Sequence, residues 1–165
     1  MARPPAGTAA LLALTRAGVA HQVRAYEPDG QVQQRDGYGA AAAAALGLDP
    51  ALLHKTLVAE VDGRLVLAVV PVSAHLDDRA LAAAAGGKQA AMADPAAAER
   101  ATGYVRGGIS PLGTRAALPT FLDAGALAHP RVLVSAGRRG LQVELDPNDL
   151  ARLTGATLAP LARRR

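Results

Sequence analysis

The chain has 165 residues, half of them apolar, a formal net charge of +4 and no cysteine. This length predicts one domain spanning residues 1–165. The absence of cysteine excludes disulfides, thiolate metal ligands and a protein thiol nucleophile. No uncharged apolar stretch is long enough to span a membrane. A basic chain without cysteine or a signal-peptide pattern is expected to be a soluble, cytoplasmic protein that attracts polyanions such as nucleic acid.

The N-terminal third is expected to contain two helices and one strand. Residues 9–17 have the apolar spacing of a helix, and Gly18 suits its C-terminal cap. Residues 21–26 alternate enough to form a strand, whereas the polar residues 28–37 contain Pro, Asp and Gly and predict a loop. Residues 39–46 predict a short alanine-rich helix.

The clearest hairpin follows. Residues 55–61 alternate as in a half-buried strand, and Asp62-Gly63 is a strong two-residue turn signal. Residues 65–70 are continuously apolar, which is typical of a strand buried on both faces.

The remaining chain mixes short helices and strands. Asp77, Asp94 and Asp146 are expected to cap helices, the last two with proline at the first helical position. Residues 103–113 contain too much Gly and Pro for a regular element. Further strands are expected at residues 120–122, 131–135 and 140–145, with residues 136–139 as a basic turn. The pattern predicts a mixed α/β (α+β) domain and disfavours a Rossmann-like sheet.

Familiar catalytic motifs are absent. The serines are Ser73, Ser110 and Ser135, and none lies in a G-x-S-x-G turn. No metal-binding spacing of histidines or carboxylates occurs, and no glycine pattern matches the phosphate-binding loops of nucleotide-binding proteins. We therefore expect neither a metal nor a cofactor.

A glycine-rich segment remains as the main candidate site. Its backbone N–H groups either bind phosphate or stabilise an oxyanion during ester cleavage, or its glycines only allow a tight connection. The segment consists of Gly107, Gly108, Ile109, Ser110, Pro111, Leu112 and Gly113.

Three further features carry similar alternatives. The segment Ser135, Ala136, Gly137, Arg138, Arg139 and Gly140 is either a hairpin turn with solvated arginines or a turn that binds an anion or a tRNA end. Only two of the 18 Lys and Arg residues are lysines, so Lys55, followed by Thr56, is either a retained functional amine or a solvated residue at a strand start. Tyr26 and Tyr38 either stack on a base or cover the edge of the core.

With these features in this order along the sequence, the chain resembles the YbaK/EbsC family of free-standing Cys-tRNA(Pro) deacylases. These proteins are relatives of the editing domain inserted in bacterial prolyl-tRNA synthetases. The resemblance extends in order over nearly the whole chain. Its motifs are Tyr26-Glu27, Leu46-Gly47-Leu48, Lys55-Thr56-Leu57, Met92-Ala93-Asp94-Pro95, Thr102-Gly103-Tyr104 with the glycine segment, Ser135 with Arg139-Gly140-Leu141, and Asp149-Leu150. The departures are a longer loop at residues 28–37, Ala136 in place of a common Gly, and His54 in place of a common aromatic residue.

The resemblance implies a mixed, partly barrel-like sheet surrounded by helices, with a pocket for the aminoacylated 3′ end of tRNA. It assigns the family's lysine to Lys55, its pocket tyrosine to Tyr26 and its loop aromatic to Tyr38. It also implies a mechanism in which the thiol of the attached cysteine cleaves its own ester, helped by backbone N–H groups around Gly107 to Ser110. Lys55→Ala and Gly108→Val are then expected to lose deacylation of Cys-tRNA while staying folded.

Two alternatives stay open. The chain is also compatible with a deacylase for Ala-tRNA(Pro) or another small amino acid, and with a non-catalytic tRNA-binding or regulatory module. The expected partner is mischarged tRNA through its acceptor end, with prolyl-tRNA synthetase as a second candidate partner. A water molecule in place of the substrate thiol is an alternative nucleophile.

Overall fold

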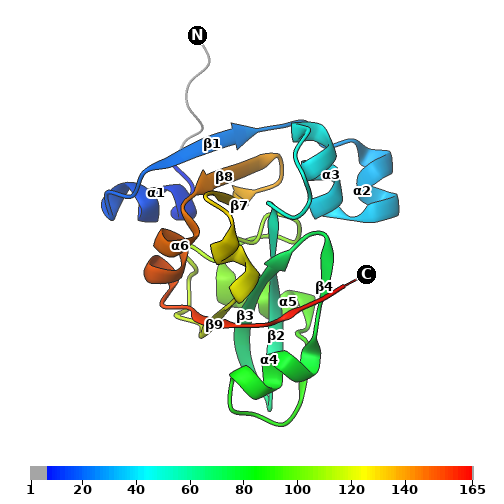
Figure 1. The fold of residues 1–165 in the computed structure, drawn as a ribbon, viewed down its shortest axis with the longest axis vertical. Helices are drawn as coiled ribbons and strands as arrows, with labels where there is room; N and C mark the ends of the chain where they lie inside the picture. Colours follow the sequence, from blue (N-terminus) through cyan, green and yellow to red (C-terminus); the bar gives the residue numbers. More distant parts are fainter. Residues whose placement is uncertain (1–6, 165) are drawn as a thin grey trace.

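The structure, a computed structural model, describes residues 7–164 (Figure 1). The helices within them are α1 (Ala9–Arg16), α2 (Gly30–Asp36), α3 (Tyr38–Leu46), α4 (Asp78–Ala84), α5 (Pro95–Thr102), the 3₁₀ helix η1 (Ala124–Ala128) and α6 (Pro147–Thr154). The strands are β1 (His21–Ala25), β2 (His54–Val61), β3 (Arg64–Pro71), β4 (Ala74–Leu76), β5 (Ala90–Met92), β6 (Thr120–Asp123), β7 (Val132–Arg138), β8 (Leu141–Leu145), β9 (Thr157–Ala159) and β10 (Ala162–Arg164).

The strands form three sheets. The largest has the order β5-β2-β3-β6-β9, with antiparallel pairing from β5 to β3 and parallel pairing from β3 to β9. A second, antiparallel sheet has the order β1-β8-β7, and β4 pairs with β10. The predicted mixed α/β class is confirmed. The sheets do not close into a barrel, because the largest sheet ends at the edges β5 and β9.

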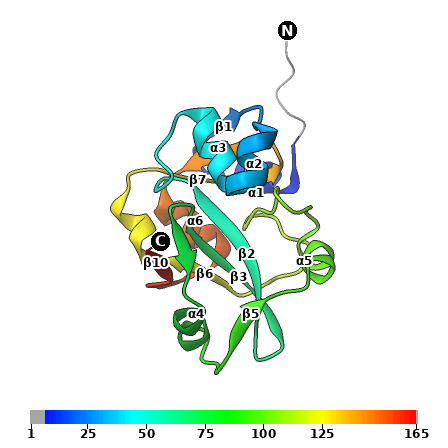
Figure 2. The same ribbon diagram turned by 90° about the vertical axis from the view of Figure 1, so that its right-hand side faces the viewer.

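The two larger sheets meet at the segment before β2. Leu53 and Leu133 form a parallel bridge between them, and the Leu133 N–H donates to the Leu52 carbonyl over 3.0 Å. In Figure 2, β2 runs from this junction away from α3, with α5 on one side. The start of β2 therefore lies where the sheets, α3 and the glycine-rich segment come together.

The core is mainly aliphatic, with Tyr104 and Phe121 as its buried aromatic residues in the part of the chain that the structure describes. The apolar run in β3 is buried on both faces. Val69 belongs to the core cluster that includes Leu14 of α1 and Leu150 of α6, whereas Ala68 and Val70 belong to the cluster that includes Leu81 of α4. The predicted turn before β3 is confirmed by Asp62 and Gly63, whose φ angles of 49° and 85° are both positive.

The predicted helix caps are confirmed. The side chains of Asp77, Asp94 and Asp146 each accept a hydrogen bond from an amide at the start of the following helix, over 3.1, 3.1 and 2.8 Å. Each aspartate therefore satisfies an N–H group that has no partner within its own helix.

The prediction of a loop over residues 28–37 is wrong for most of its length. Residues 30–36 form α2, because Asp29 acts as an N-cap and accepts from the amides of Gln31 and Val32 over 2.8 and 3.4 Å. Gly37, with φ of 97°, then separates α2 from α3. The Pro, Asp and Gly residues therefore mark helix ends rather than a continuous loop.

One other expectation needs correction. The basic turn predicted at residues 136–139 is shorter, because β7 continues through a bulge to Arg138 and only Arg139 and Gly140 turn. At the C-terminal end, residues 162–164 pair with β4, although their side chains are exposed; Arg165 lies outside the described residues.

No helix among residues 7–164 is long and apolar enough to cross a membrane. Within the same residues, no group of three or more His, Cys, Asp or Glu side chains is arranged to hold a metal ion.

Candidate functional site

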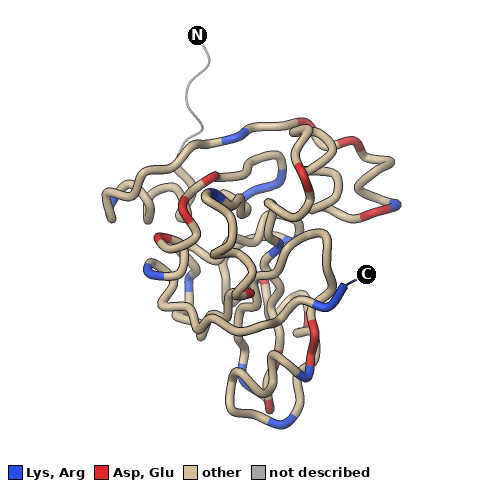
Figure 3. The backbone as a smooth tube through the Cα atoms, in the orientation of Figure 1, with Lys and Arg blue, Asp and Glu red and all other residues tan. Residues whose placement is uncertain are grey.

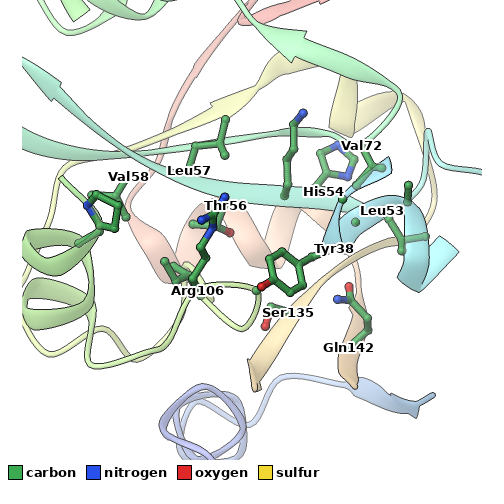
Figure 4. A pocket seen from close by; sticks show the side chains of 18 of the residues that line it. Tyr38, Leu53, His54, Thr56, Leu57, Val58, Val72, Arg106, Ser135 and Gln142 are labelled. Atoms are coloured by element: carbon green, nitrogen blue, oxygen red, sulfur yellow. The ribbon is translucent and has the colours of Figure 1, made fainter. Parts of the chain in front are cut away.

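A cavity of about 510 Å³ opens at the junction of the two larger sheets (Figure 4). It is bordered by β2, the N-terminal end of α3, α5, the glycine-rich segment and the β7–β8 hairpin. The sequence-predicted residues that line it are Tyr26, Tyr38, Lys55, Thr56, Gly107, Ile109 and Ser135.

The start of β2 borders the cavity along one edge. β5 pairs with β2 at Ala59–Val61, and the Ala93 N–H donates to the Val58 carbonyl over 3.0 Å. Within residues 7–164, residues 54–57 therefore pair with β3 on one side and with no named strand on the other. For this reason consecutive β2 residues, including Lys55 and Thr56, reach the cavity. The hydroxyl of Thr56 is buried without a hydrogen-bond partner among the described residues.

The glycine-rich segment is shaped by close packing. Gly107 has φ of 86°, and a Cβ atom there would lie 2.6 Å from the Tyr38 ring. A Cβ atom at Gly108 would lie 2.7 Å from the Cα of Arg138. The Gly108 N–H donates to the Val105 carbonyl over 2.9 Å, so this amide is used within the segment. A valine at Gly108 would press on the Arg138 backbone, so we now expect Gly108→Val to be destabilised as well as inactive.

The rim of the cavity, which consists of Tyr38, Arg106, Arg138 and Arg139, is stabilised by contacts of Arg139. The guanidinium carbon of Arg139 lies 4.9 Å from the centroid of the Tyr38 ring, a cation–π contact. Arg139 Nε also donates to the Arg106 carbonyl over 2.7 Å. Through these contacts Arg139 connects α3, the glycine-rich segment and the turn after β7.

The β7–β8 hairpin supplies two polar side chains. Ser135 and Gln142 are cross-strand partners, and both line the cavity. Ser135 Oγ accepts from the Gly137 amide over 3.1 Å. Gln142 is 8% exposed, and its Oε1 atom has no hydrogen-bond partner among the described residues. The cavity wall thus contains a buried acceptor that a ligand donor can satisfy.

The other sequence-predicted residues lie outside the cavity lining. Ser110 is fully buried, and its Oγ accepts from the Leu112 amide over 3.2 Å. Leu112 is in the core, and its carbonyl accepts from the Tyr104 hydroxyl over 2.6 Å. Burial raises the pKa of Tyr104 to about 12, so this hydroxyl remains a donor. The others are Gly108, Pro111, Gly113, Ala136, Gly137, Arg138, Arg139 and Gly140.

Two of these residues, Gly113 and Ala136, contact α1 and its N-cap residue rather than the cavity. A Cβ atom at Gly113 would lie 2.5 Å from the Ala9 carbonyl oxygen, so the glycine allows α1 to approach. The Ala136 carbonyl accepts a hydrogen bond from the Thr8 hydroxyl, which also caps α1. These contacts join α1 to the hairpin and to the end of the glycine-rich segment.

Sequence reasoning missed five polar lining residues, Asp36, His54, Glu99, Arg106 and Gln142. His54 is 3% exposed, and burial is the main cause that lowers its pKa below 6.5. The signal for Gln142 was present, because it alternates with Leu141 and Val143 in β8 and so faces away from their core. No pattern in the sequence indicated Glu99 or Arg106.

The fold matches that of solved structures. One solved structure, described as "a putative trans-editing enzyme for prolyl tRNA synthetase", has a TM-score of 0.82 and 26% identity, and the match covers 98% of this chain and 99% of that one. The structure of "hypothetical protein APE2540", at 24% identity and a TM-score of 0.79 over 91% and 96% of the two chains, has the same fold. The molecule is thus of the class of small α/β trans-editing folds.

Sequence comparison gives the family. The model of the "Aminoacyl-tRNA editing domain" matches residues 36–153. An Enterococcus faecalis protein, "Putative Cys-tRNA(Pro)/Cys-tRNA(Cys) deacylase EbsC", is 39% identical over 121 residues, which are 72% of this chain and 73% of that protein. The chain belongs to the aminoacyl-tRNA editing domain family, and the resemblance noted from its motifs is confirmed.

Proposed function

We propose that this chain is a free-standing deacylase that removes cysteine from mischarged Cys-tRNA(Pro), with Cys-tRNA(Cys) as a second substrate. The observation that carries the proposal is one cavity lined by Lys55 and Thr56 of β2, Gly107 of the glycine-rich segment and Ser135 of β7. The name of the Enterococcus faecalis relative supports the choice of amino acid and tRNA. The proposal puts the enzyme in the cytoplasm, where tRNA is aminoacylated.

The proposed chemistry needs no nucleophile from the protein. The substrate thiol attacks its own ester carbonyl, a C–S bond forms, and the bond to the 3′ oxygen of the tRNA breaks. Attack within one molecule benefits from a high effective molarity. Lys55 would bind the terminal ribose or phosphate, or stabilise charge on the leaving oxygen. Because the Gly108 amide already donates to Val105, Gly107 and Ile109 are the loop residues whose amides we assign to the oxyanion.

Unpaired acceptors suit the α-ammonium group of the substrate. Gln142 Oε1 and Thr56 Oγ are both buried without partners in the described chain, and both side chains line the cavity. A buried polar atom without a hydrogen bond costs about 1–3 kcal/mol. An ammonium group that donates to both atoms would recover this cost and orient the ester.

The rim would bind the acceptor end of the tRNA. Arg106, Arg138 and Arg139 are exposed and close together, since Arg139 bonds to Arg106 and Arg138 packs on Gly108. Figure 3 marks the turn after β7 as a basic segment. Arginines at the rim would bind phosphates without reading the tRNA sequence. Recognition of one tRNA would then need a partner, for which prolyl-tRNA synthetase is our candidate.

A deacylation panel tests the proposal. The purified protein is incubated with tRNA(Pro) carrying cysteine, serine or alanine, and loss of the ester is measured against buffer alone. We expect cysteine to be removed fastest. Fastest removal of alanine would replace the proposal with a small-amino-acid deacylase. Binding of tRNA without loss of any ester would replace it with a non-catalytic module.

A further inference from the structure

His54 is a buried imidazole at the edge of the cavity that the proposed chemistry does not yet use. It is the first residue of β2, pairs in register with Pro71 and is 3% exposed. Figure 4 shows its ring beside the apolar side chain of Val72, with Leu53 nearby. An imidazole in such surroundings is strongly favoured in its neutral form.

One hydrogen bond determines which ring nitrogen carries the proton. His54 Nδ1 lies 3.1 Å from the Leu52 carbonyl oxygen. A carbonyl only accepts, so Nδ1 must hold the hydrogen, and Nε2 of the neutral ring is an acceptor with a lone pair. Within residues 7–164 the only hydrogen bond of this ring is the one at Nδ1. His54 is a lining residue of the cavity, and Nε2 is the ring nitrogen left to accept a proton from a ligand.

The charged and titratable groups around the ring do not reverse this state. Desolvation by burial has the largest effect on the His54 pKa and lowers it; the Leu52 carbonyl and Asp123 of β6 favour the charged imidazole, and His129 after η1 disfavours it. The groups that share the cavity with His54 are Tyr26, Asp36, Tyr38, Lys55, Glu99 and Arg106. The pKa of His54 is below 6.5, so the ring is mainly neutral at pH 7.

We propose that His54 Nε2 accepts the side-chain proton of the bound aminoacyl group, and that the enzyme thereby selects an amino acid carrying S–H on its β-carbon. This inference rests on the proposed function and names the specificity residue of that site. An alanyl group has no such donor and would leave Nε2 unpaired, which is unfavourable in a buried site. A seryl group can donate but is a poor nucleophile, so it would bind and turn over slowly.

The proton movements balance within one turnover. The thiol proton moves to His54 Nε2, and the thiolate sulfur forms the bond to the ester carbon. The bond from that carbon to the 3′ oxygen then breaks, and the imidazolium returns its proton to the oxygen. The products are a cyclic thioester and tRNA with a free 3′ hydroxyl, and His54 is neutral again.

The test compares His54→Phe with the wild type over pH 5 to 9, using Cys-tRNA(Pro). Phenylalanine keeps a ring of similar size, and His21→Gln is the control because His21 does not line the cavity and is not among the groups that shift the His54 pKa. We expect the wild-type rate to level off above pH 6.5. His54→Phe should be slower by about 10²-fold at pH 7, and its rate should keep rising with the fraction of thiolate. The His21→Gln rate should stay close to wild type.

Each outcome separates the two proposals. No turnover of Cys-tRNA(Pro) by the wild type would overturn the proposed function. Turnover by the wild type with an unchanged rate and pH profile in His54→Phe would overturn only the role of His54.

A second measurement covers the case in which His54→Phe does not fold. Nuclear magnetic resonance of the wild type should report His54 with its proton on Nδ1 at pH 7. A non-hydrolysable 3′-amide of adenosine carrying cysteine should shift the Nε2 resonance, and the alanine analogue should not. Equal shifts with both analogues would also overturn the role.

Discussion

Arg139 stacks on Tyr38, with its guanidinium carbon 4.9 Å from the ring centroid. The same arginine donates through Nε to the Arg106 carbonyl. The tyrosine on α3 and the arginine on the β7–β8 turn both contact the start of the glycine-rich segment, because the Tyr38 ring lies directly against Gly107. The rim of the cavity is formed by contacts between segments far apart in the sequence.

The stacked pair should be energetically coupled. We expect a double-mutant cycle of Tyr38→Leu and Arg139→Gln, measured as kcat/KM for Cys-tRNA(Pro), to give a coupling energy of about 0.5–1 kcal/mol, the range of exposed cation–π contacts. Arg138→Gln replaces the stacking arginine's neighbour and should show no coupling to Tyr38. Additive effects of Tyr38→Leu and Arg139→Gln would mean that the stacking has no role in activity.

The two lysines provide a matched pair of variants. Lys55 lines the cavity, whereas Lys88 is exposed near the β2–β3 turn, where its backbone N–H donates to Asp62 over 2.9 Å. Lys55→Ala should lower kcat/KM by about 10²-fold or more, the typical effect of removing a group that stabilises developing charge. Lys88→Ala should leave the rate unchanged. Equal rates for the two variants would remove Lys55 from the site.

Glycine substitutions should separate packing from helix propensity. At Gly108 a Cβ atom would lie 2.7 Å from the Cα of Arg138, and backbone cannot move aside easily. Gly108→Ala should therefore lower the free energy of unfolding by about 1–3 kcal/mol, as in overpacked cores. Gly30 begins α2, and a Cβ there meets nothing within 4 Å. Gly30→Ala should be neutral or stabilising by up to about 1 kcal/mol. Urea unfolding of both variants checks this.

The sequence was sufficient to predict elements that are determined by neighbouring residues, such as turns and helix caps. The β2–β3 hairpin was predicted because Asp62 and Gly63 favour the positive φ angles that the turn requires. The short strands β4 and β10 were missed because three residues are too few to show a period, and their pairing depends on Asp123, which accepts from the amides of Leu161 and Ala162.

The residues of the candidate site also fall into those that the sequence indicated and those that depend on tertiary packing. Lys55 and Gly107 stood out from the sequence by rarity and by glycine content, and both line the cavity. Their assigned roles stay predictions. Ser110 was indistinguishable from a site residue in the sequence, yet its hydroxyl is buried against the Leu112 amide. Gln142 was missed because only tertiary packing leaves its Oε1 buried and unpaired.

Stability should fall at acidic pH because of His54. Burial is the main cause that lowers the pKa of His54 in the folded state below 6.5. Between that lowered value and 6.5 the unfolded chain binds a proton more readily, so protonation favours unfolding. The contribution of His54 to stability is complete above pH 6.5 and is lost as pH falls toward the folded pKa. Urea unfolding at several pH values should show a smaller decrease for His54→Phe than for wild type. An equal decrease in both would assign the effect to other groups.

Binding of the acceptor end should depend on salt through the rim arginines. For single-stranded nucleic acid, the binding constant falls with salt, and each phosphate contact contributes about −0.7 to the slope of log K against log salt. Arg106 and Arg138 are exposed, and Arg106 also lines the cavity. Arg106→Gln and Arg138→Gln should each reduce the slope for a CCA-ended oligonucleotide by about 0.7. Arg79→Gln on α4 should not, because that residue is exposed and away from the cavity lining. Unchanged slopes for both rim variants would move the RNA-binding surface elsewhere on the molecule.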